Sequence, residues 1–194
     1  MYGKSGSNYT NSAEEVLAMT KGENGIWYIE KAGDLNGLYY NYLVTIDGKV
    51  NEVTDPYAKA VGVNGNRGMV IDLASTNPEG WENDTKPELV DPTDSIIYEM
   101  HIRDFSIDEN SGVTLEYNGK YNGVWQSGTT IPGSDVKTGV DHLKELGVTT
   151  VHILPTFDHR SIDETKLDTK QYNWGYDPQN YNVPEGSYSS DPYA

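Results

Sequence analysis

The sequence has 194 residues and contains no cysteine. Without cysteine the chain can form neither disulfides nor thiolate metal sites, and it offers no cysteine nucleophile. The absence does not decide where the protein resides, because proteins without cysteine occur inside and outside cells. We leave the location open and slightly favour the exterior over the cytoplasm.

Basic residues are scarce, because 14 Lys and Arg oppose 30 Asp and Glu and give a formal net charge of -16. A surface of this sign repels phosphate backbones and anionic headgroups, so we expect no nucleic acid partner. Long apolar runs are also missing, since no stretch reaches the ~18 residues of a transmembrane helix. The first residues lack the pattern of a secretory leader. We therefore expect no membrane partner either.

Phenylalanine is rare, with 2 Phe beside 15 Tyr and 4 Trp. Tyrosine and tryptophan combine a flat apolar face with a polar edge, which is the combination that carbohydrates require of a binding surface. Tyrosine could equally replace phenylalanine in an acidic, soluble protein. Composition alone does not choose between these readings.

The first third of the chain has the pattern of antiparallel strands. Asn24-Gly25 and Asp47-Gly48 predict two-residue hairpins, and the alternation from Leu38 to Ile46 predicts one strand between them. A polar stretch with three prolines follows at residues 74–94 and reads as an interdomain linker. We therefore predict a partial β-sandwich over residues 1–73.

Residues 95–194 have a different pattern. Residues 96–105 and Val148 to Leu154 predict two strands, and a helix between them begins near Thr138 and ends at Gly147. A strand, helix and strand in this order imply a parallel sheet. Polar residues on one face of the first strand and long connections after both strands favour the beginning of a (β/α)₈ TIM barrel over an open sheet. The predicted fold class is thus α/β plus all-β.

One segment carries a specific motif, Tyr172-Asn173-Trp174-Gly175-Tyr176-Asp177-Pro178. It resembles the signature of type I pullulanases within glycoside hydrolase family 13, the α-amylase family. Residues 98–106, 139–147 and 151–158 resemble the first strand, first helix and second strand of that family's barrel. Residues 25–58 are similar to the latter part of the starch-binding β-sandwich that precedes it, the family 48 carbohydrate-binding module.

The resemblance implies a parent hydrolase that debranches starch. Such an enzyme cleaves α-1,6-glucosidic linkages in pullulan, amylopectin and limit dextrins with retention of configuration, and it requires no cofactor. A retaining glycosidase needs two carboxyl groups ~5 Å apart, one as nucleophile and one as acid/base. In the family these come from later barrel segments. The resemblance therefore implies no catalytic residue in this chain, inactivity of the isolated chain, and two partners, an α-glucan and the remainder of the barrel.

The resemblance also assigns substrate-binding roles within the motif. Tyr176 would be the aromatic platform under the glucose ring at the cleaved bond, and Asp177 would hydrogen-bond sugar hydroxyls or catalytic side chains. The alternatives are a packed core tyrosine and a turn partner before Pro178. Trp174, Asn173 and Tyr172 complete the candidate site, and for the first two we favour shaping the loop over contact with sugar.

Several other residues have a structural reading that we favour. Arg103 and Asp104 predict an ion pair at the end of a strand, and His101 and His152 predict inner-layer strand residues without metal-ligand spacing. Trp27 resembles a structural tryptophan of the β-sandwich, with an exposed sugar platform as the alternative.

The acidic residues of the loop at residues 162–168 could hold a structural calcium ion. They lack the spacing of an EF-hand, and a solvated loop fits them better.

Two other functions stay open at this point. The chain could be a non-catalytic α-glucan-binding module or scaffold protein, which a further chain supplying six more barrel strands would distinguish from an enzyme. Among enzymes, a branching or isoamylase-like activity is the weaker rival. The rate on pullulan compared with glycogen would separate it from debranching of the pullulanase type.

Overall fold

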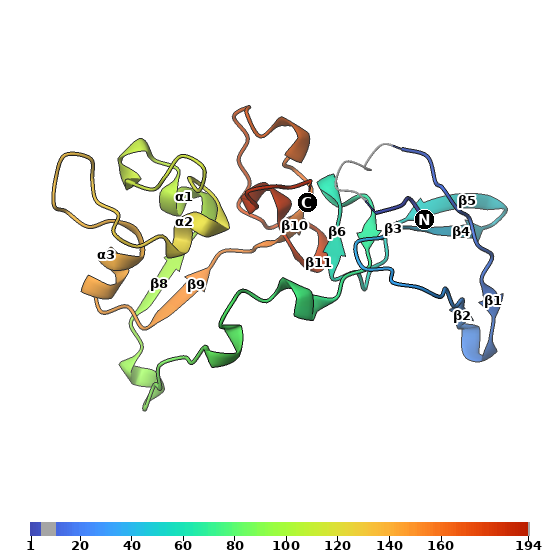
Figure 1. Ribbon diagram of the computed structural model, residues 1–194, viewed down its shortest axis with the longest axis horizontal. Helices are drawn as coiled ribbons and strands as arrows, with labels where there is room; N and C mark the ends of the chain where they lie inside the picture. Colours follow the sequence, from blue (N-terminus) through green and yellow to red (C-terminus); the bar gives the residue numbers. More distant parts are fainter. Residues whose placement is uncertain (5–10, 194) are drawn as a thin grey trace.

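The computed structural model describes residues 1–4 and 11–193. Its elements form an elongated molecule with antiparallel sheets at one end, a strand-helix-strand unit at the other, and a C-terminal hairpin between them (Figure 1). Most of the secondary structure is small β-sheets with few helices, so the expected β-rich N-terminal part is confirmed. Among the described residues no helix is long and apolar enough to cross a membrane.

The N-terminal part contains three small antiparallel sheets. Their strands are β1 (Thr20–Lys21) with β2 (Trp27–Tyr28), β4 (Tyr42–Ile46) with β5 (Lys49–Val53), and β3 (Tyr39–Tyr40), β7 (Gly68–Met69) and β6 (Ala60–Val61) in that order. Trp27 is 56% exposed, so the structural packing role predicted for it is wrong within this chain.

The two predicted hairpins both exist, and one has the predicted length. Asp47 and Gly48 have φ of +50° and +77° and form a two-residue turn between β4 and β5, as predicted. Asn24 and Gly25 also have positive φ, +54° and +79°, but five residues separate β1 from β2. The second prediction is therefore right about the turn and wrong about the loop length.

The single strand predicted from Leu38 to Ile46 is wrong, because the chain breaks at Asn41. The Asn41 side-chain amide donates to Glu52 Oε1 and to the Asn66 carbonyl, both at 2.9 Å. On either side of this residue β3 pairs with β7 while β4 pairs with β5. The predicted strand is therefore divided between two separate sheets.

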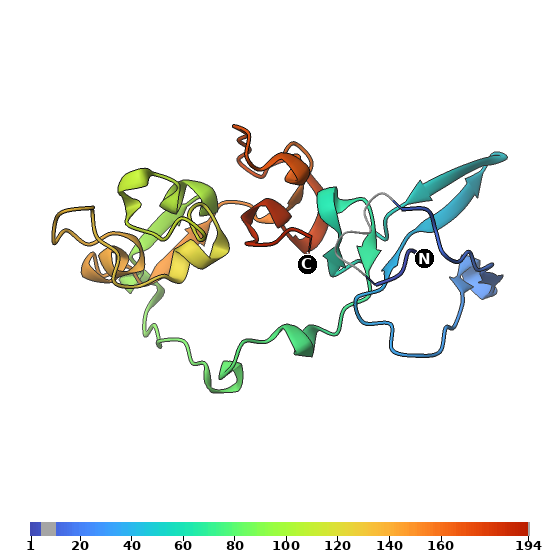
Figure 2. The same cartoon turned by 45° about the horizontal axis from the view of Figure 1, so that its top comes forward.

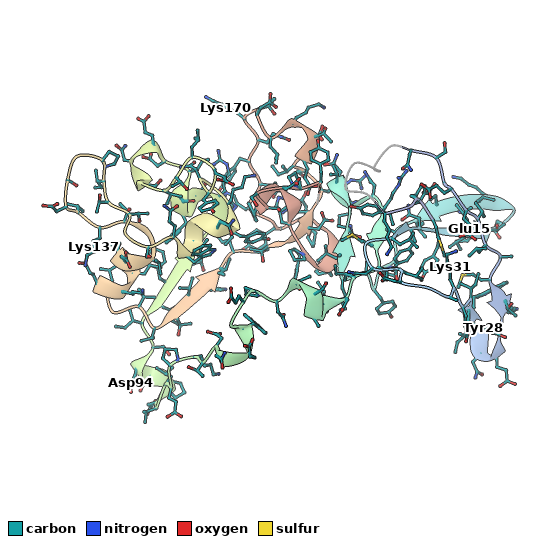
Figure 3. The ribbon with its side chains drawn as sticks, viewed as in Figure 1. Glu15, Tyr28, Lys31, Asp94, Lys137 and Lys170 are labelled. Atoms are coloured by element: carbon teal, nitrogen blue, oxygen red, sulfur yellow. The ribbon has the colours of Figure 1, made fainter. Side chains whose placement is uncertain are left out.

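Residues 72–94 are exposed throughout and contain no strand. They form three short 3₁₀ turns: Leu73–Thr76, Trp81–Asn83 and Pro92–Asp94. In Figure 1 this green segment runs below the molecule from the N-terminal sheets to β8, and Figure 3 labels Asp94 at its far end.

The second half contains the predicted parallel unit. β8 (Ile97–Met100) pairs in parallel with β9 (Thr150–Ile153), and the connection between them carries α1 (Ile102–Ser106), α2 (Tyr121–Trp125) and α3 (Gly139–Glu145). The helix ends as predicted, since Gly147 has φ of +73° and its N–H donates to the Lys144 carbonyl. His152 is exposed and its Nδ1 lies 3.2 Å from Glu99 Oε2, so it is not an inner-layer residue here.

The first strand ends earlier than predicted, because a helix begins at Ile102. The side chain of His101 accepts the N–H of Asp104 at 3.3 Å and caps the helix, so residues 102–105 are helical instead of extended. Ile102 packs with Met100 and Tyr188 in the core of this part. His101 is buried, but as a helix cap.

The chain after β9 forms a bulged antiparallel hairpin. Its strands are β10 (Phe157–His159) and β11 (Pro178–Pro184), and both views place them beside β6 (Figure 1, Figure 2). The Asn180 side-chain amide donates to the Gly65 carbonyl at 2.9 Å. Asn64 and Glu164 exchange two hydrogen bonds, from the Asn64 N–H to Glu164 Oε2 (2.8 Å) and from the Glu164 N–H to Asn64 Oδ1 (2.7 Å). The hairpin thus joins the two halves of the chain.

Candidate functional site

The motif loop, residues 172–177, is held against the start of α1 by hydrogen bonds. The Tyr172 hydroxyl donates to Asp104 Oδ2 at 3.1 Å, and the Asn173 carbonyl lies 2.9 Å from His101 Nε2. Arg103 forms the predicted ion pair with Asp104, at 3.2 Å. The first turn after β8 therefore positions a segment about 70 residues later in the sequence.

His101 has one ring tautomer that satisfies all its contacts. Because Nδ1 accepts the N–H of Asp104, the ring proton sits on Nε2. This N–H faces the Asn173 carbonyl and the Tyr188 hydroxyl oxygen, each at 2.9 Å. The buried imidazole of His101 thus contacts both the motif loop and Tyr188.

The turn of the loop depends on Gly175. Its φ is +89°, and a Cβ there would collide with the carbonyl oxygen of Pro155 and lie 3.1 Å from the Pro155 carbonyl carbon. Its N–H donates to Asn173 Oδ1 at 2.8 Å, which closes the turn. Only glycine combines this φ with this close approach.

Asp177 is partly exposed, and each oxygen of its carboxylate accepts one hydrogen bond from a neighbouring side chain. Its two carboxylate oxygens accept from the Ser161 hydroxyl and the Asn173 amide. The Ser161 hydrogen bond, more than the Asn173 bond, holds the pKa of Asp177 below its ordinary value. The carboxylate is therefore ionised at neutral pH.

The aromatic side chains of the loop face outward. Trp174 is 60% exposed, Tyr176 68% and Tyr172 49%. Tyr176 is thus not a packed core residue in this chain. The structure brings the five predicted residues together in one fixed loop, and their contact with sugar stays a prediction.

Three buried carboxylates come together outside the motif loop, and of these the sequence analysis considered only Glu164, in the loop at residues 162–168. Asp158 in β10, Glu164 at the start of a 3₁₀ turn and Glu185 after β11 are 2%, 5% and 1% exposed. We call these three residues the acid cluster; one ligand atom from each lies within 4.8 Å of the others. Burial raises the pKa of Asp158 to about 6 and that of Glu164 to about 7.

The prediction that the acidic residues of the loop at residues 162–168 face solvent is confirmed for Asp168 and wrong for Glu164. Asp163 caps the turn through the Thr165 N–H and pairs with Lys166 at 2.7 Å, near the surface. Glu164 points inward instead. Nothing in the sequence of this loop distinguishes Glu164 from its neighbour Asp163, and Asp158 and Glu185 reach the cluster only through the pairing of β10 with β11.

Known proteins resemble the chain over nearly its whole length, although no family model matches it. It is 40% identical over 188 residues to the pullulanase of Bacillus subtilis (strain 168), covering 96% of this chain and 25% of that protein. The structure of Paenibacillus barengoltzii pullulanase with maltohexaose and α-cyclodextrin superposes with a TM-score of 0.90 and 51% identity, covering 95% of this chain and 28% of that one.

The Bacillus acidopullulyticus pullulanase gives a TM-score of 0.87 and 49% identity, covering 95% of this chain and 22% of that one. The chain thus spans about a quarter of the length of its relatives. Over that quarter, the resemblance to type I pullulanases predicted from the motif is confirmed.

Proposed function

We propose that this chain is part of a glycoside hydrolase that cleaves α-1,6 branch linkages in pullulan, amylopectin and limit dextrins with retention of configuration. The observation that carries the proposal is the motif loop, where the exposed ring of Tyr176 adjoins the ionised Asp177. An aromatic face binds the apolar side of a sugar, and a carboxylate accepts from its hydroxyls. The maltohexaose and α-cyclodextrin bound to the Paenibacillus relative support an α-glucan ligand.

The proposal includes a (β/α)₈ barrel that begins with β8, α3 and β9. Apolar residues on these strands are exposed, with Ile97 at 64%, Val151 at 41% and Ile153 at 43%. Further barrel strands and helices would cover them, and would supply the nucleophile and the acid/base carboxyl. Domain boundaries at residues 73/74 and 94/95 belong to the same proposal.

Within such a barrel the motif loop would lie at the rim where substrates bind, because it follows the C-terminal end of β9. The hydrogen bonds from His101 and Tyr172 hold the loop before sugar arrives. Preorganisation of this kind lowers the cost of ordering on binding. Tyr176 would then support the distorted glucose ring of the transition state from below.

The test uses a hybrid protein in which this chain replaces the matching quarter of Bacillus subtilis pullulanase. We expect Tyr176→Ala to lower kcat on pullulan more than it raises KM, by about 2 to 4 kcal/mol in transition-state stabilisation. Tyr176→Phe keeps the stacking face and should cost much less. Tyr57→Ala, at an 84% exposed position in the N-terminal part, is the matched control.

The assignment of Tyr176 fails if Tyr176→Ala hydrolyses pullulan within about threefold of the unmodified hybrid, a difference below 1 kcal/mol. A hybrid that folds, shows a cooperative melt and hydrolyses no pullulan would contradict the enzymatic proposal itself. Comparing pullulan with glycogen as substrate would separate debranching of the pullulanase type from an isoamylase-like activity.

A second candidate, glucan binding without cleavage, is favoured by the β1–β2 hairpin. Trp27 and Tyr28 are 56% and 55% exposed on adjacent positions of β2, so their rings project from opposite faces of the strand. Trp27→Ala in the hybrid should reduce retention on insoluble starch and leave the rate of hydrolysis of soluble pullulan unchanged. Unchanged retention would remove this candidate.

A further inference from the structure

The long connection between β8 and β9 carries an exposed aromatic surface outside the motif loop. Trp125, the last residue of α2, is 65% exposed, and its ring centroid lies 6.3 Å from that of Tyr117, with the ring planes at 40°. Leu115, two residues before Tyr117, is 92% exposed. We call these three residues the α2 platform. Large apolar side chains that gather on a surface are typical of a binding site.

The turn before α2 is fixed to the core through Ser106, which has no exposed surface. The Ser106 hydroxyl accepts the Gly119 N–H at 2.8 Å, and its carbonyl accepts the Asn118 side-chain amide at 2.6 Å. A Cβ at Gly123 would collide with the Ser106 hydroxyl oxygen and the Tyr117 carbonyl oxygen, so glycine lets α2 approach this turn closely. The platform is therefore ordered before any ligand arrives, which lowers the cost of binding.

The α2 platform shares its support with the motif loop. Tyr121, the first residue of α2, packs edge-on against Tyr188, with ring centroids 5.6 Å apart. The Tyr188 hydroxyl lies 2.9 Å from His101 Nε2, which also faces the Asn173 carbonyl. Figure 1 shows α1 and α2 beyond the end to which β8 points. In a barrel, the connections after β8 and β9 both lie at the rim where substrates bind.

Two side-chain amides border the rings. Asn122 Oδ1 accepts from the Trp125 indole N–H at 3.3 Å. Gln126 Oε1 accepts from both the N–H and the hydroxyl of Thr114 at 3.1 Å, which brings the neighbouring Leu115 to the end of α2. Each amide is thus oriented through its oxygen, and within residues 1–4 and 11–193 neither NH₂ group has an acceptor. Both groups can therefore donate to the hydroxyls of a ligand.

The surface around the platform is nearly uncharged, although the chain carries a net charge of -16. Of residues 114–134, only Glu116 and Lys120 are charged, and Lys120 is half-buried and donates to the Ser187 carbonyl at 2.7 Å. Such a surface offers a charged macromolecule no electrostatic attraction. Three side chains also fall well short of the roughly 800 Å² that each partner buries in a stable protein complex.

A neutral carbohydrate chain fits these properties. The apolar faces of its sugar rings stack on aromatic side chains, and its hydroxyls accept from amides. An α-1,4-linked glucan also curves, because each linkage is axial at one ring and equatorial at the next. Two rings tilted by 40° can therefore contact two successive glucose units whose faces are rotated relative to each other.

We propose that the α2 platform is a second binding surface for an α-1,4-linked glucan chain, separate from the motif loop. The inference rests on the α-glucan specificity of the proposed function, and it adds a place that holds the chain away from the cleaved branch. Attachment at a second point raises the effective concentration of the substrate at the first. Long, branched glucans gain from such a surface more than short oligosaccharides, which cannot span both.

The experiment measures the retardation of the hybrid in native gels that contain amylopectin. The background variant carries Tyr176→Ala and Trp27→Ala, which remove the aromatic faces of the two other proposed glucan surfaces. Adding Trp125→Ala should raise the Kd for amylopectin about tenfold, because a large stacking face is lost. Trp125→Tyr keeps a flat face and should restore most of the retardation. Trp81→Ala, at a 55% exposed tryptophan within residues 72–94, is the matched control and should leave the Kd unchanged.

Asn122→Asp provides a second variant of nearly equal volume, which decides if Trp125→Ala gives no cooperative melt. It keeps the acceptor of the indole N–H but removes the NH₂ donor, so it should also weaken the retardation. A folded Trp125→Ala variant whose Kd lies within about twofold of the background overturns the proposal. So does a dimer of the hybrid in sedimentation that Trp125→Ala dissociates, because it would assign the surface to a second copy of the chain.

The outcomes separate this inference from the proposed function. A folded hybrid that hydrolyses no pullulan but shows retardation dependent on Trp125 contradicts the enzymatic proposal and supports the α2 platform. A hybrid that hydrolyses pullulan while its retardation is independent of Trp125 supports the enzyme and overturns the platform.

Discussion

Replacing Gly175 by alanine should damage the motif loop more than any ordinary glycine replacement. The residue has φ of +89°, and a left-handed conformation costs an alanine about 1 to 2 kcal/mol. The new Cβ would also press on the Pro155 carbonyl, which belongs to backbone and cannot rotate away. Relief of such overpacking costs about 1 to 3 kcal/mol more. We expect a total loss of about 2 to 5 kcal/mol.

The control separates the two contributions. Gly133 has φ of +77° and nothing within 4 Å of a Cβ, so Gly133→Ala carries the conformational cost without the collision. Unfolding of the hybrid in urea, followed by fluorescence, gives the two losses side by side. Because Tyr176 and Asp177 follow Gly175 directly, a shift of the loop by about 1 Å should also reduce pullulan hydrolysis on the order of 100-fold. Equal losses of stability for Gly175→Ala and Gly133→Ala would refute the reasoning.

Two further predictions concern the N-terminal part and its junction with the hairpin. Asn64→Gly keeps the positive φ but removes the acceptor of the Glu164 N–H, so we expect the free energy of unfolding in urea to fall by about 1 to 3 kcal/mol. Asn182→Gly, at an exposed residue with φ of +63°, is the control and should leave the free energy of unfolding unchanged. Equal effects of the two substitutions would contradict the prediction. Burial, followed by a hydrogen bond to Asp55, raises the pKa of Tyr40, so the folded state holds this proton more tightly than the unfolded state. That stabilisation is complete below the pKa of tyrosine in the unfolded chain, about 10, and is lost as the pH rises above this value towards the pKa of the folded state. Absorbance at 295 nm during a pH titration should show Tyr40 ionising at a higher pH than a free tyrosine. Ionisation of Tyr40 near pH 10 would disprove the prediction.

Local turn chemistry was predictable because few residues decide it. Asp47 and Gly48 both adopt positive φ, and Gly147 ends α3, since only short-range sterics are involved. The early end of β8 was not predictable, because the alternating segment of residues 96–105 fits a strand throughout, and only the cap formed by the His101 side chain shows that a helix begins at Ile102. The break at Asn41 likewise depends on partners 11 and 25 residues away.

The same distinction between local and long-range contacts applies to the candidate site. The motif residues from Tyr172 to Asp177 lie in one short segment, so the sequence alone could identify them. The acid cluster could not be found that way, because Glu164 and Glu185 are separated by β11 and become neighbours only when β10 and β11 pair. Buried carboxylates also contradict the general rule that acidic residues face water.

The junction between the hairpin and the N-terminal part also has a consequence for synthesis on the ribosome. Asn64 and Gly65 find their hydrogen-bond partners 100 and 115 residues later in the chain. At about 5 to 20 residues per second, the ribosome needs roughly 5 to 20 seconds to deliver them. During that interval the nascent N-terminal sheets present an unpaired edge to water and to chaperones, and the contacts that complete this edge form only when the later segment has been translated.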